Sequence, residues 1–237
     1  MIETTNQWLN NLNALTAGLF LLTAFGLVAM RQVRACLQLF IAQSLLLAVS
    51  AFLLSLHYQS DHLLGVAVLN LISKPLIVPW LLRRTLPAEI YTRREINQVL
   101  NIPSALLIAL GLAILAYFLA VPLSQALRLG FGEANIPIGI AGLLLGAFTL
   151  TVRREAIPLL IGLLEMENGA FFTGISIAPN LPLLVELAIA ADGLIIVFIT
   201  GVLTRAVQKQ VGITAVGELA SLKEDSAQTA EKAEGIK

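Results

Sequence analysis

Seven apolar stretches of membrane-spanning length constrain this sequence more than any other feature. A helix needs about 20 apolar residues to cross the hydrocarbon core of a bilayer. Because lipid offers no hydrogen-bond partners, a spanning segment must satisfy its own backbone groups, and a helix does so. The sequence therefore predicts an all-α, polytopic membrane protein of about seven transmembrane helices. The seven stretches are Leu12–Met30, Ala35–Leu56, His62–Leu82, Pro103–Gln125, Ile136–Val152, Ala156–Ala178 and Leu181–Arg205.

Composition narrows the class of function. Only 13% of the residues are charged, against roughly 25% in soluble domains, and a net charge of zero argues against binding to nucleic acid. The single cysteine, Cys36, excludes an internal disulfide and a four-cysteine cluster or zinc site held by this chain alone. The loops are short and carry none of the common nucleotide-binding, zinc-protease or redox motifs. We expect no cofactor, no metal and no catalysis by this chain alone.

The basic residues predict an orientation in the membrane. Thirteen of the fifteen lysines and arginines fall on one side, in the turns after the first, third and fifth helices and after the seventh. The opposite side has only Arg128, and Lys74 lies within a span. The positive-inside rule then places the N-terminus outside and the C-terminus in the cytoplasm.

Three regions are expected along the chain. Residues 1–134 form an N-terminal four-helix membrane region, residues 135–207 a three-helix membrane region, and residues 208–237 a polar cytoplasmic tail. The first three and the last three helices share a layout with an arginine-bearing turn after the first helix of each set. This layout is typical of a parallel repeat, although any group of three helices with short loops resembles it.

Lys74 is the most unusual residue of the third predicted helix. It lies near the middle of the span and is followed by Pro75, with Pro79 one turn later. Proline removes a backbone donor and clashes with the carbonyl four residues earlier, so the helix should be kinked or unwound between Leu71 and Pro79. Burial favours the neutral form of a lysine, which suits a proton station. The alternative is an ion pair with a neighbouring subunit that serves assembly only.

The sixth predicted helix carries Glu165, Glu167 and Asn168 near the bilayer centre. Residues three apart share a helix face, so Glu165 and Asn168 should lie together. Glu167 points away from Glu165, so the two acids are not expected to form one carboxylate pair. One acid could serve a path through this chain while the other meets a neighbouring subunit, or helix contacts could satisfy both.

Asp192 and Glu186 lie in the seventh predicted helix. Asp192 is at mid-depth, and Glu186 is about 9 Å further out, at a rise of about 1.5 Å per residue. Ionisable residues inside a span mark functional sites by default. Lys74, Glu165 or Glu167, and Asp192 would then form a row at mid-height with the chemistry of a proton relay.

The last three predicted helices resemble a family. An apolar helix ending at Arg153 is followed by Leu160–Gly169, which reads LIGLLEMENG, and by a third helix that ends at Arg205. This pattern is similar to the K subunit of NADH:quinone oxidoreductase and the C subunit of multisubunit cation/proton antiporters. The K subunit has an LIGLE-type motif, whose glutamate position is Leu164 here, with the acid one residue later. Its second glutamate corresponds to Asp192.

Over nearly the whole chain, the sequence resembles the hydrogenase-4 component E family. The resemblance implies a non-catalytic membrane subunit of an energy-converting nickel–iron hydrogenase or formate hydrogenlyase complex in the bacterial cytoplasmic (inner) membrane. It implies antiporter-like and quinone-site-like membrane partners and a peripheral redox arm, with iron–sulfur clusters and a nickel–iron site on other subunits. Two alternatives stay open, namely a subunit of a cation/proton antiporter and a purely structural bridging subunit.

Overall fold

The computed structural model describes residues 2–85, 100–127 and 130–178, together with 195, 197–199, 201 and 202. Within this part the chain is helical, as expected from its apolar stretches. The helices are α1 (Ile2–Ala29), α2 (Val33–Tyr58), α3 (Asp61–Ile72), α4 (Val78–Thr85), α6 (Ile102–Leu127), α7 (Asn135–Val152) and α8 (Ala156–Ile177), and a π-helical turn, η1 (Ser73–Ile77), joins α3 to α4.

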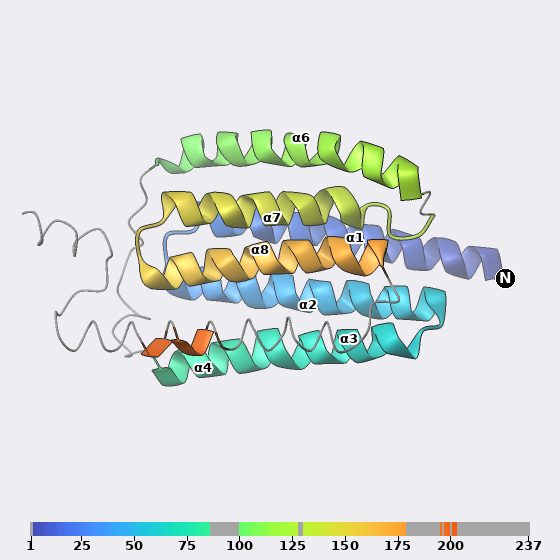
Figure 1. The fold of residues 1–237 in the computed structure, drawn as a ribbon, viewed down its shortest axis with the longest axis horizontal. Helices are drawn as coiled ribbons and strands as arrows, with labels where there is room; N and C mark the ends of the chain where they lie inside the picture. The colour runs from blue at the N-terminus through green and yellow to red at the C-terminus, as the bar shows by residue number, and fades with distance from the viewer. Residues whose placement is uncertain are drawn as a thin grey trace, which may run out of the picture.

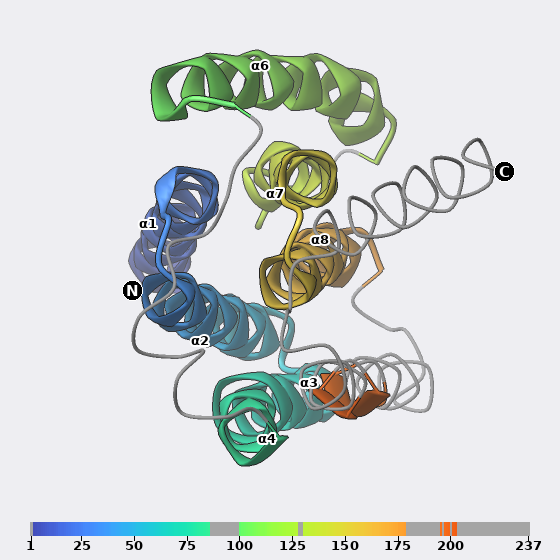
Figure 2. The same ribbon diagram turned by 90° about the vertical axis from the view of Figure 1, so that its left-hand side faces the viewer.

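The helices run side by side in a bundle (Figure 1). Viewed along the helix axes, α7 and α8 lie at the centre with α1 and α2 next to them (Figure 2). The continuous rod of α3, η1 and α4 packs below α2, and α6 lies above α1 and α7 at the edge of the bundle. The span of α6 is only 17% buried inside the chain, so most of its apolar surface is left for lipid or other subunits.

Among the described residues, five helical segments are long and apolar enough to cross a membrane: Asn6–Ala29, Val33–Tyr58, Asp61–Leu81, Ile102–Leu127 and Asn135–Val152. These correspond to the first five predicted spans. The sixth, α8, is more polar because it holds two glutamates and an asparagine, but its 22 residues extend about 33 Å, which is enough to cross a bilayer. The seventh predicted span and residues 208–237 lie outside the described residues, apart from the short helical stretch at 195–202.

Helix α1 begins earlier than expected. The apolar stretch begins at Leu12, but the helix begins at Ile2. Apolar character reports the part of a helix that suits lipid, whereas a helix that is already nucleated can continue into polar sequence at little cost. The first turns of α1, with the exposed Trp8, therefore extend beyond the predicted span.

Glycines bring α7 and α8 into backbone contact. A Cβ atom at Gly169 of α8 would collide with the backbone of Gly139, Gly142 and Leu143 on α7. A Cβ at Gly146 would likewise collide with the backbone of Met166. Small residues allow such close approach in membrane helices, where van der Waals packing is a main source of association. We call this close contact between α7 and α8 the seam. It fixes the rotation of α8 about its own axis, and hence the directions of the polar side chains of α8.

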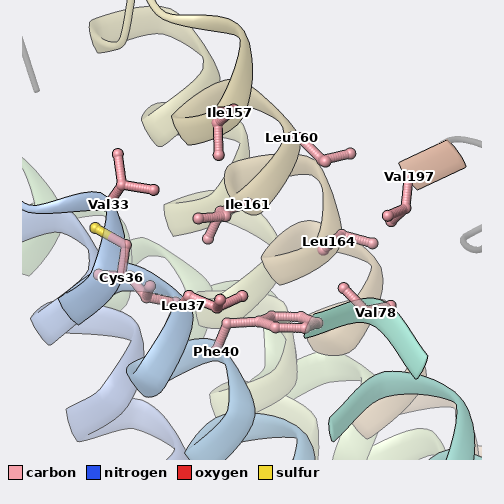
Figure 3. Close-up of a cluster of buried hydrophobic side chains, with 11 residues drawn as sticks. Val33, Cys36, Leu37, Phe40, Val78, Ile157, Leu160, Ile161, Leu164 and Val197 are labelled. Carbon is pink, nitrogen blue, oxygen red and sulfur yellow. The ribbon is translucent and has the colours of Figure 1, made fainter. Parts of the chain in front are cut away.

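The apolar core near the arginine-bearing turns joins α1, α2, α4 and α8 with the residue Val197. Leu37 and Phe40 from α2 pack with Leu160 and Leu164 from α8, and Val197 of the short helical stretch faces them (Figure 3). Further contributors are Leu27, Val33, Cys36, Val78, Ile157 and Ile161. The cluster packs around the first turns of α8 and so holds the N-terminal half of that helix between α2 and α4.

Candidate functional site

An ion pair inside the bundle joins two distant helices. Lys74 Nζ lies 2.9 Å from Glu167 Oε1, and Lys74 is almost fully buried while the Glu167 side chain is 20% exposed. The ammonium group also lies 5.6 Å from the centre of the Phe171 ring, close enough for a cation–π contact. Lys74 therefore has its acidic partner within the same chain.

A π-helical turn presents Lys74 to α8. The turn covers Ser73–Ile77, where Pro75 removes one backbone donor and Pro79 follows one turn later. The α-helical hydrogen-bond pattern is interrupted in this segment, although the rod remains continuous (Figure 1). Such π-helical turns are rare and occur frequently at functional sites. Lys74 lies in the widened turn, and its side chain reaches Glu167.

Asn168 extends the ion pair to α2. Lys74 Nζ donates to Asn168 Oδ1 at 2.8 Å. The amide nitrogen of Asn168 in turn donates to Gln43 Oε1 and Ser44 Oγ, both at 3.1 Å. We call these five residues, Gln43, Ser44, Lys74, Glu167 and Asn168, the charged network. It connects α2, η1 and α8 through side chains alone, so it depends on all three helices being in place.

Glu165 lies on another side of α8 and is separate from the ion pair. The side chain is completely buried, and neither carboxyl oxygen has a hydrogen-bond partner among the residues that the structure describes. Its polar neighbours are Thr149 and Arg153, but the Thr149 hydroxyl donates to the Leu145 carbonyl at 2.9 Å. A buried carboxyl group in this state is costly as an anion.

Arg153 lies near Glu165 and caps the C-terminal end of α1. Its Nη2 atom donates to the carbonyl oxygens of Leu27, Val28 and Met30 at 2.9, 3.2 and 2.6 Å. These carbonyls belong to the end of α1, which has no basic residue of its own in its last turn. Arg153 is 4% exposed, and within the described residues its Nε and Nη1 atoms have no hydrogen-bond partner.

A second buried network lies towards the other end of the bundle and contains no charge. Asn13 Nδ2 donates to Asn135 Oδ1 at 3.0 Å, and Ser50 Oγ donates to Asn13 Oδ1 at 2.7 Å. Asn135 Nδ2 donates to Ser50 Oγ at 3.1 Å and to Ser176 Oγ at 2.9 Å. We call these four residues the neutral network. It joins α1, α2, α7 and α8, and each of its side chains has a partner.

The predicted row at mid-height is partly brought together. Lys74, Glu167 and Asn168 meet, whereas Glu165 lies on a different side of α8 and Asp192 and Glu186 lie outside the described residues. Glu165 and Asn168 are both fully buried, but they contact different neighbours. The separation of Glu165 from Glu167 agrees with their spacing along the helix.

Besides the neutral network, the site residues Gln43, Ser44 and Arg153 were not among the candidate site residues singled out from the sequence. Gln43 and Ser44 are adjacent polar residues in an otherwise apolar stretch, which was the available signal for a buried role. Arg153 was used only as a marker of orientation and as part of the family resemblance. Its capping role depends on the contact between two turns far apart in the sequence, which a charge pattern does not reveal.

The described residues offer no other evident site. No group of three or more His, Cys, Asp or Glu residues among them could hold a metal ion. A groove of about 480 Å³ lies between α6, α1 and α7, and its lining is mainly apolar, with Tyr117, Ser124 and Glu133 as its polar members. None of the predicted site residues lines this groove.

Comparison with known proteins gives the chain full-length relatives. It is 30% identical to uncharacterized protein Rv0085 of Mycobacterium tuberculosis over 208 residues, which are 88% of this chain and 94% of the relative. It is 28% identical to hydrogenase-4 component E of Escherichia coli K12 over 229 residues, 93% of this chain and 99% of the relative. Hydrogenase-4 component E of Shigella flexneri matches to the same extent. No family model matches the sequence, and no solved structure matches it.

Proposed function

The chain belongs to the same family as protein Rv0085 and is a homologue of hydrogenase-4 component E, and on this basis we propose that it is a non-catalytic membrane subunit of a hydrogenase-type redox complex. We further propose that it contributes to the path of proton translocation and to assembly of the membrane arm. The full-length match supports the first part. The buried ionisable groups support the second.

Glu165 is the observation that carries the proton-path proposal. A carboxyl group at the centre of a membrane helix costs roughly 2.5 kcal/mol or more on insertion scales, and hydrogen bonds normally offset part of this cost. Glu165 is fully buried, and Thr149 is the one side chain placed to hydrogen-bond it, although neither carboxyl oxygen has a partner of good hydrogen-bond geometry among the described residues. A residue that served only to hold helices together would be expected to have such partners, as the members of the neutral network do. An acid whose role is to take up and release a proton does not need the hydrogen bonds that a purely structural residue would form.

The charged network supplies a second buried set of ionisable groups. Lys74 Nζ lies 2.9 Å from Glu167 Oε1 and donates to Asn168 Oδ1 at 2.8 Å. Loss or gain of a proton in this pair changes the charge buried next to α8. The effect of that charge on other titratable groups falls with distance but is strong in a medium of low dielectric.

The partners and the orientation follow from the family resemblance and the charge pattern. We propose antiporter-like and quinone-site-like subunits as membrane neighbours, and a peripheral redox arm that carries the iron–sulfur clusters and the nickel–iron site. Neither group would be held by this chain. The chain would lie in the bacterial inner membrane with its N-terminus outside and its C-terminus in the cytoplasm.

The test is proton translocation by the assembled complex in membrane vesicles, per electron transferred. Glu165→Gln keeps the size of the side chain and removes its titration, and we expect assembly to persist while the ratio of protons to electrons falls by half or more. Asp192→Asn should act in the same direction, and Glu167→Gln more weakly. Ser176→Ala, in the neutral network, is the matched control and should leave the ratio unchanged.

Three results would separate this proposal from its alternatives. A wild-type ratio in both Glu165→Gln and Asp192→Asn would leave a structural bridging role. Sodium-dependent transport with no redox arm in the purified complex would identify an antiporter subunit. A normal ratio in Ser176→Ala together with a lowered ratio in Glu165→Gln would support the proton path.

A further inference from the structure

Helix α6 packs on the bundle along its first half and leaves a groove along its second half. Ala105 and Ala109 lie in a buried apolar cluster with residues of α1 and α7. From Ala113 to Ser124, α6 instead lines the groove of about 480 Å³ that it forms with α1 and α7. Four of the side chains in the lining are alanines, and their small size leaves the space open. The volume lies within roughly 300–1,000 Å³, the usual range of sites for small ligands.

The groove is as long as one leaflet of a bilayer is deep. Ala113 and Ser124 are eleven positions apart, which is about 16 Å along a helix with a rise of about 1.5 Å per residue. Half of a hydrocarbon core of about 30 Å is about 15 Å. The apolar stretch of α6 ends next to Ser124, at Gln125, so Ser124 lies near the membrane surface and Ala113 near the bilayer centre. One acyl chain of a phospholipid spans this distance.

The surface end of the groove carries a carboxylate. Glu133 and Ser124 line that end, Tyr117 lies two turns further in, and the deeper part includes the apolar Leu21 and Ala141. Glu133 is exposed and forms no ion pair with any residue that the structure describes. A carboxylate forms its strongest hydrogen bonds with a cationic donor such as an ammonium group. An amphiphile with an apolar chain and an ammonium group in its head therefore matches both ends of the groove.

We propose that the groove binds one molecule of phosphatidylethanolamine, with an acyl chain between α6, α1 and α7 and the amine of the headgroup on Glu133. A transmembrane helix of another subunit is about 10–12 Å wide with its side chains, so it would cover α6 from outside and leave the groove open. Glu165 and the charged network do not line the groove, so the lipid site does not depend on the proposed function. The lipid completes the packing of the half of α6 that this chain leaves open.

The experiment identifies the lipid that stays on the protein by native mass spectrometry. The full chain is placed in nanodiscs of phosphatidylethanolamine and phosphatidylglycerol in equal parts, with identical acyl chains, together with a small amount of an isoprenoid quinone. The protein is released from the nanodiscs in the instrument, and each retained molecule is recognised by its mass. Because the two phospholipids differ only in the headgroup, their ratio reports recognition at the surface end of the groove.

We expect one retained phospholipid per chain, with phosphatidylethanolamine retained about three times as often as phosphatidylglycerol. Threefold corresponds to about 0.7 kcal/mol, at about 1.4 kcal/mol per tenfold, which is in the range of an ion pair at an exposed site. Glu133→Gln should reduce this ratio to about one. Asp61→Asn is the matched control, because Asp61 is also an exposed acid at this end of the bundle but does not line the groove. It should keep the wild-type ratio.

The place of the acyl chain is tested separately. Ala113→Phe fills the groove and should lower the fraction of chains that carry a lipid about tenfold, or by about 1.4 kcal/mol. Ala113→Leu adds less volume and should lower this fraction by a smaller factor. Leu115→Phe is the matched control, because Leu115 is 47% exposed and does not line the groove, and it should retain lipid as the wild type does.

Four results would overturn the proposal. The wild type could show no preference between the two headgroups, or it could carry the quinone in place of a phospholipid. Glu133→Gln could keep the wild-type ratio. Both Ala113 variants could carry as much lipid as Leu115→Phe, which would place any retained lipid outside this groove.

Discussion

The charged and the neutral network differ in how completely their polar atoms are paired. Both are buried, and both join helices that are far apart in the sequence. In the neutral network, Asn13, Ser50, Asn135 and Ser176 exchange hydrogen bonds until each side chain is engaged. In the charged network, Gln43 Nε2 has no partner in the described residues, and Glu167 Oε1 receives no well-directed hydrogen bond although Lys74 Nζ lies close to it.

This difference indicates two uses of buried polar groups in one bundle. A fully hydrogen-bonded network of amides and hydroxyls contains no group that changes its charge. Its role is to hold the helices in position. A network of ionisable groups with spare donors and acceptors can adopt more than one protonation state at similar energy. Departures from complete pairing are expected where a protein performs its function. Among the described residues they lie around Lys74, Glu165 and Arg153, and also at His57 and His62 near the turn between α2 and α3.

The largest effect is expected from a change that affects both networks. Gly169→Leu places a side chain where the backbone of α7 lies, and neither helix can yield without moving Asn168 and Ser176 from their partners. We expect the folded chain to be lost, measured as the monodisperse fraction after extraction in mild detergent. Gly174→Leu is the control, because a Cβ there meets no atom within 4 Å, and it should yield nearly as much protein as the wild type. Equal loss in both variants would show that the seam is not the cause.

An intermediate effect is expected in the charged network. Lys74→Met keeps the length of the side chain but leaves Glu167 without its cation and Asn168 without its donor. Removal of one partner from a buried pair costs about 3–5 kcal/mol, and we expect the lower end because the Glu167 side chain is partly exposed. The free energy of unfolding in mixed micelles measures this. Lys74→Met with Glu167→Leu should recover at least half of the loss, and no recovery would mean that the pair itself is not what stabilises the fold.

The smallest effect is expected in the neutral network. Asn135→Ala removes the three hydrogen bonds of the Asn135 side chain, but the hydroxyl groups and Asn13 can rearrange among themselves. Side-chain hydrogen bonds in membrane proteins contribute about 0.6 kcal/mol each on average, so we expect a loss of about 2 kcal/mol in the free energy of unfolding. Proton translocation per electron should not change in the complex that assembles. A lowered ratio would remove the distinction between the two networks.

Much of the fold could be predicted from the sequence because burial in lipid leaves a strong signal. Apolar stretches marked the described helices, and the prolines near Lys74 marked the place where the α-helix is interrupted. The separation of Glu165 from Glu167 follows from their spacing. The pairing of Lys74 with Glu167 could not be predicted, because it depends on how two helices are rotated against each other. The glycines of α7 and α8 fix how α8 is rotated, and so where Glu167 points. How closely the two helices pack cannot be calculated from sequence spacing alone.

The neutral network escaped prediction for a related reason. Asn13 and Asn135 lie near the ends of apolar stretches, where a polar residue usually faces water or lipid headgroups. Their burial results from α1, α2, α7 and α8 meeting at one place. A pattern along one helix reports which face is polar, but it does not report that another polar face has been brought to meet it.

The cap on α1 has a consequence for the order in which the protein is made. The carbonyls at the end of α1 are bound by a residue 126 positions later in the chain. At about 5–20 residues per second, synthesis takes about 6 to 25 s to cover that distance. During this time α1 and α2 have been synthesised, but the carbonyls at the end of α1 still lack the hydrogen bonds from Arg153. The end of α1 is therefore capped only when α7 and the turn after it bring Arg153 into place, which makes this contact a late event in biogenesis.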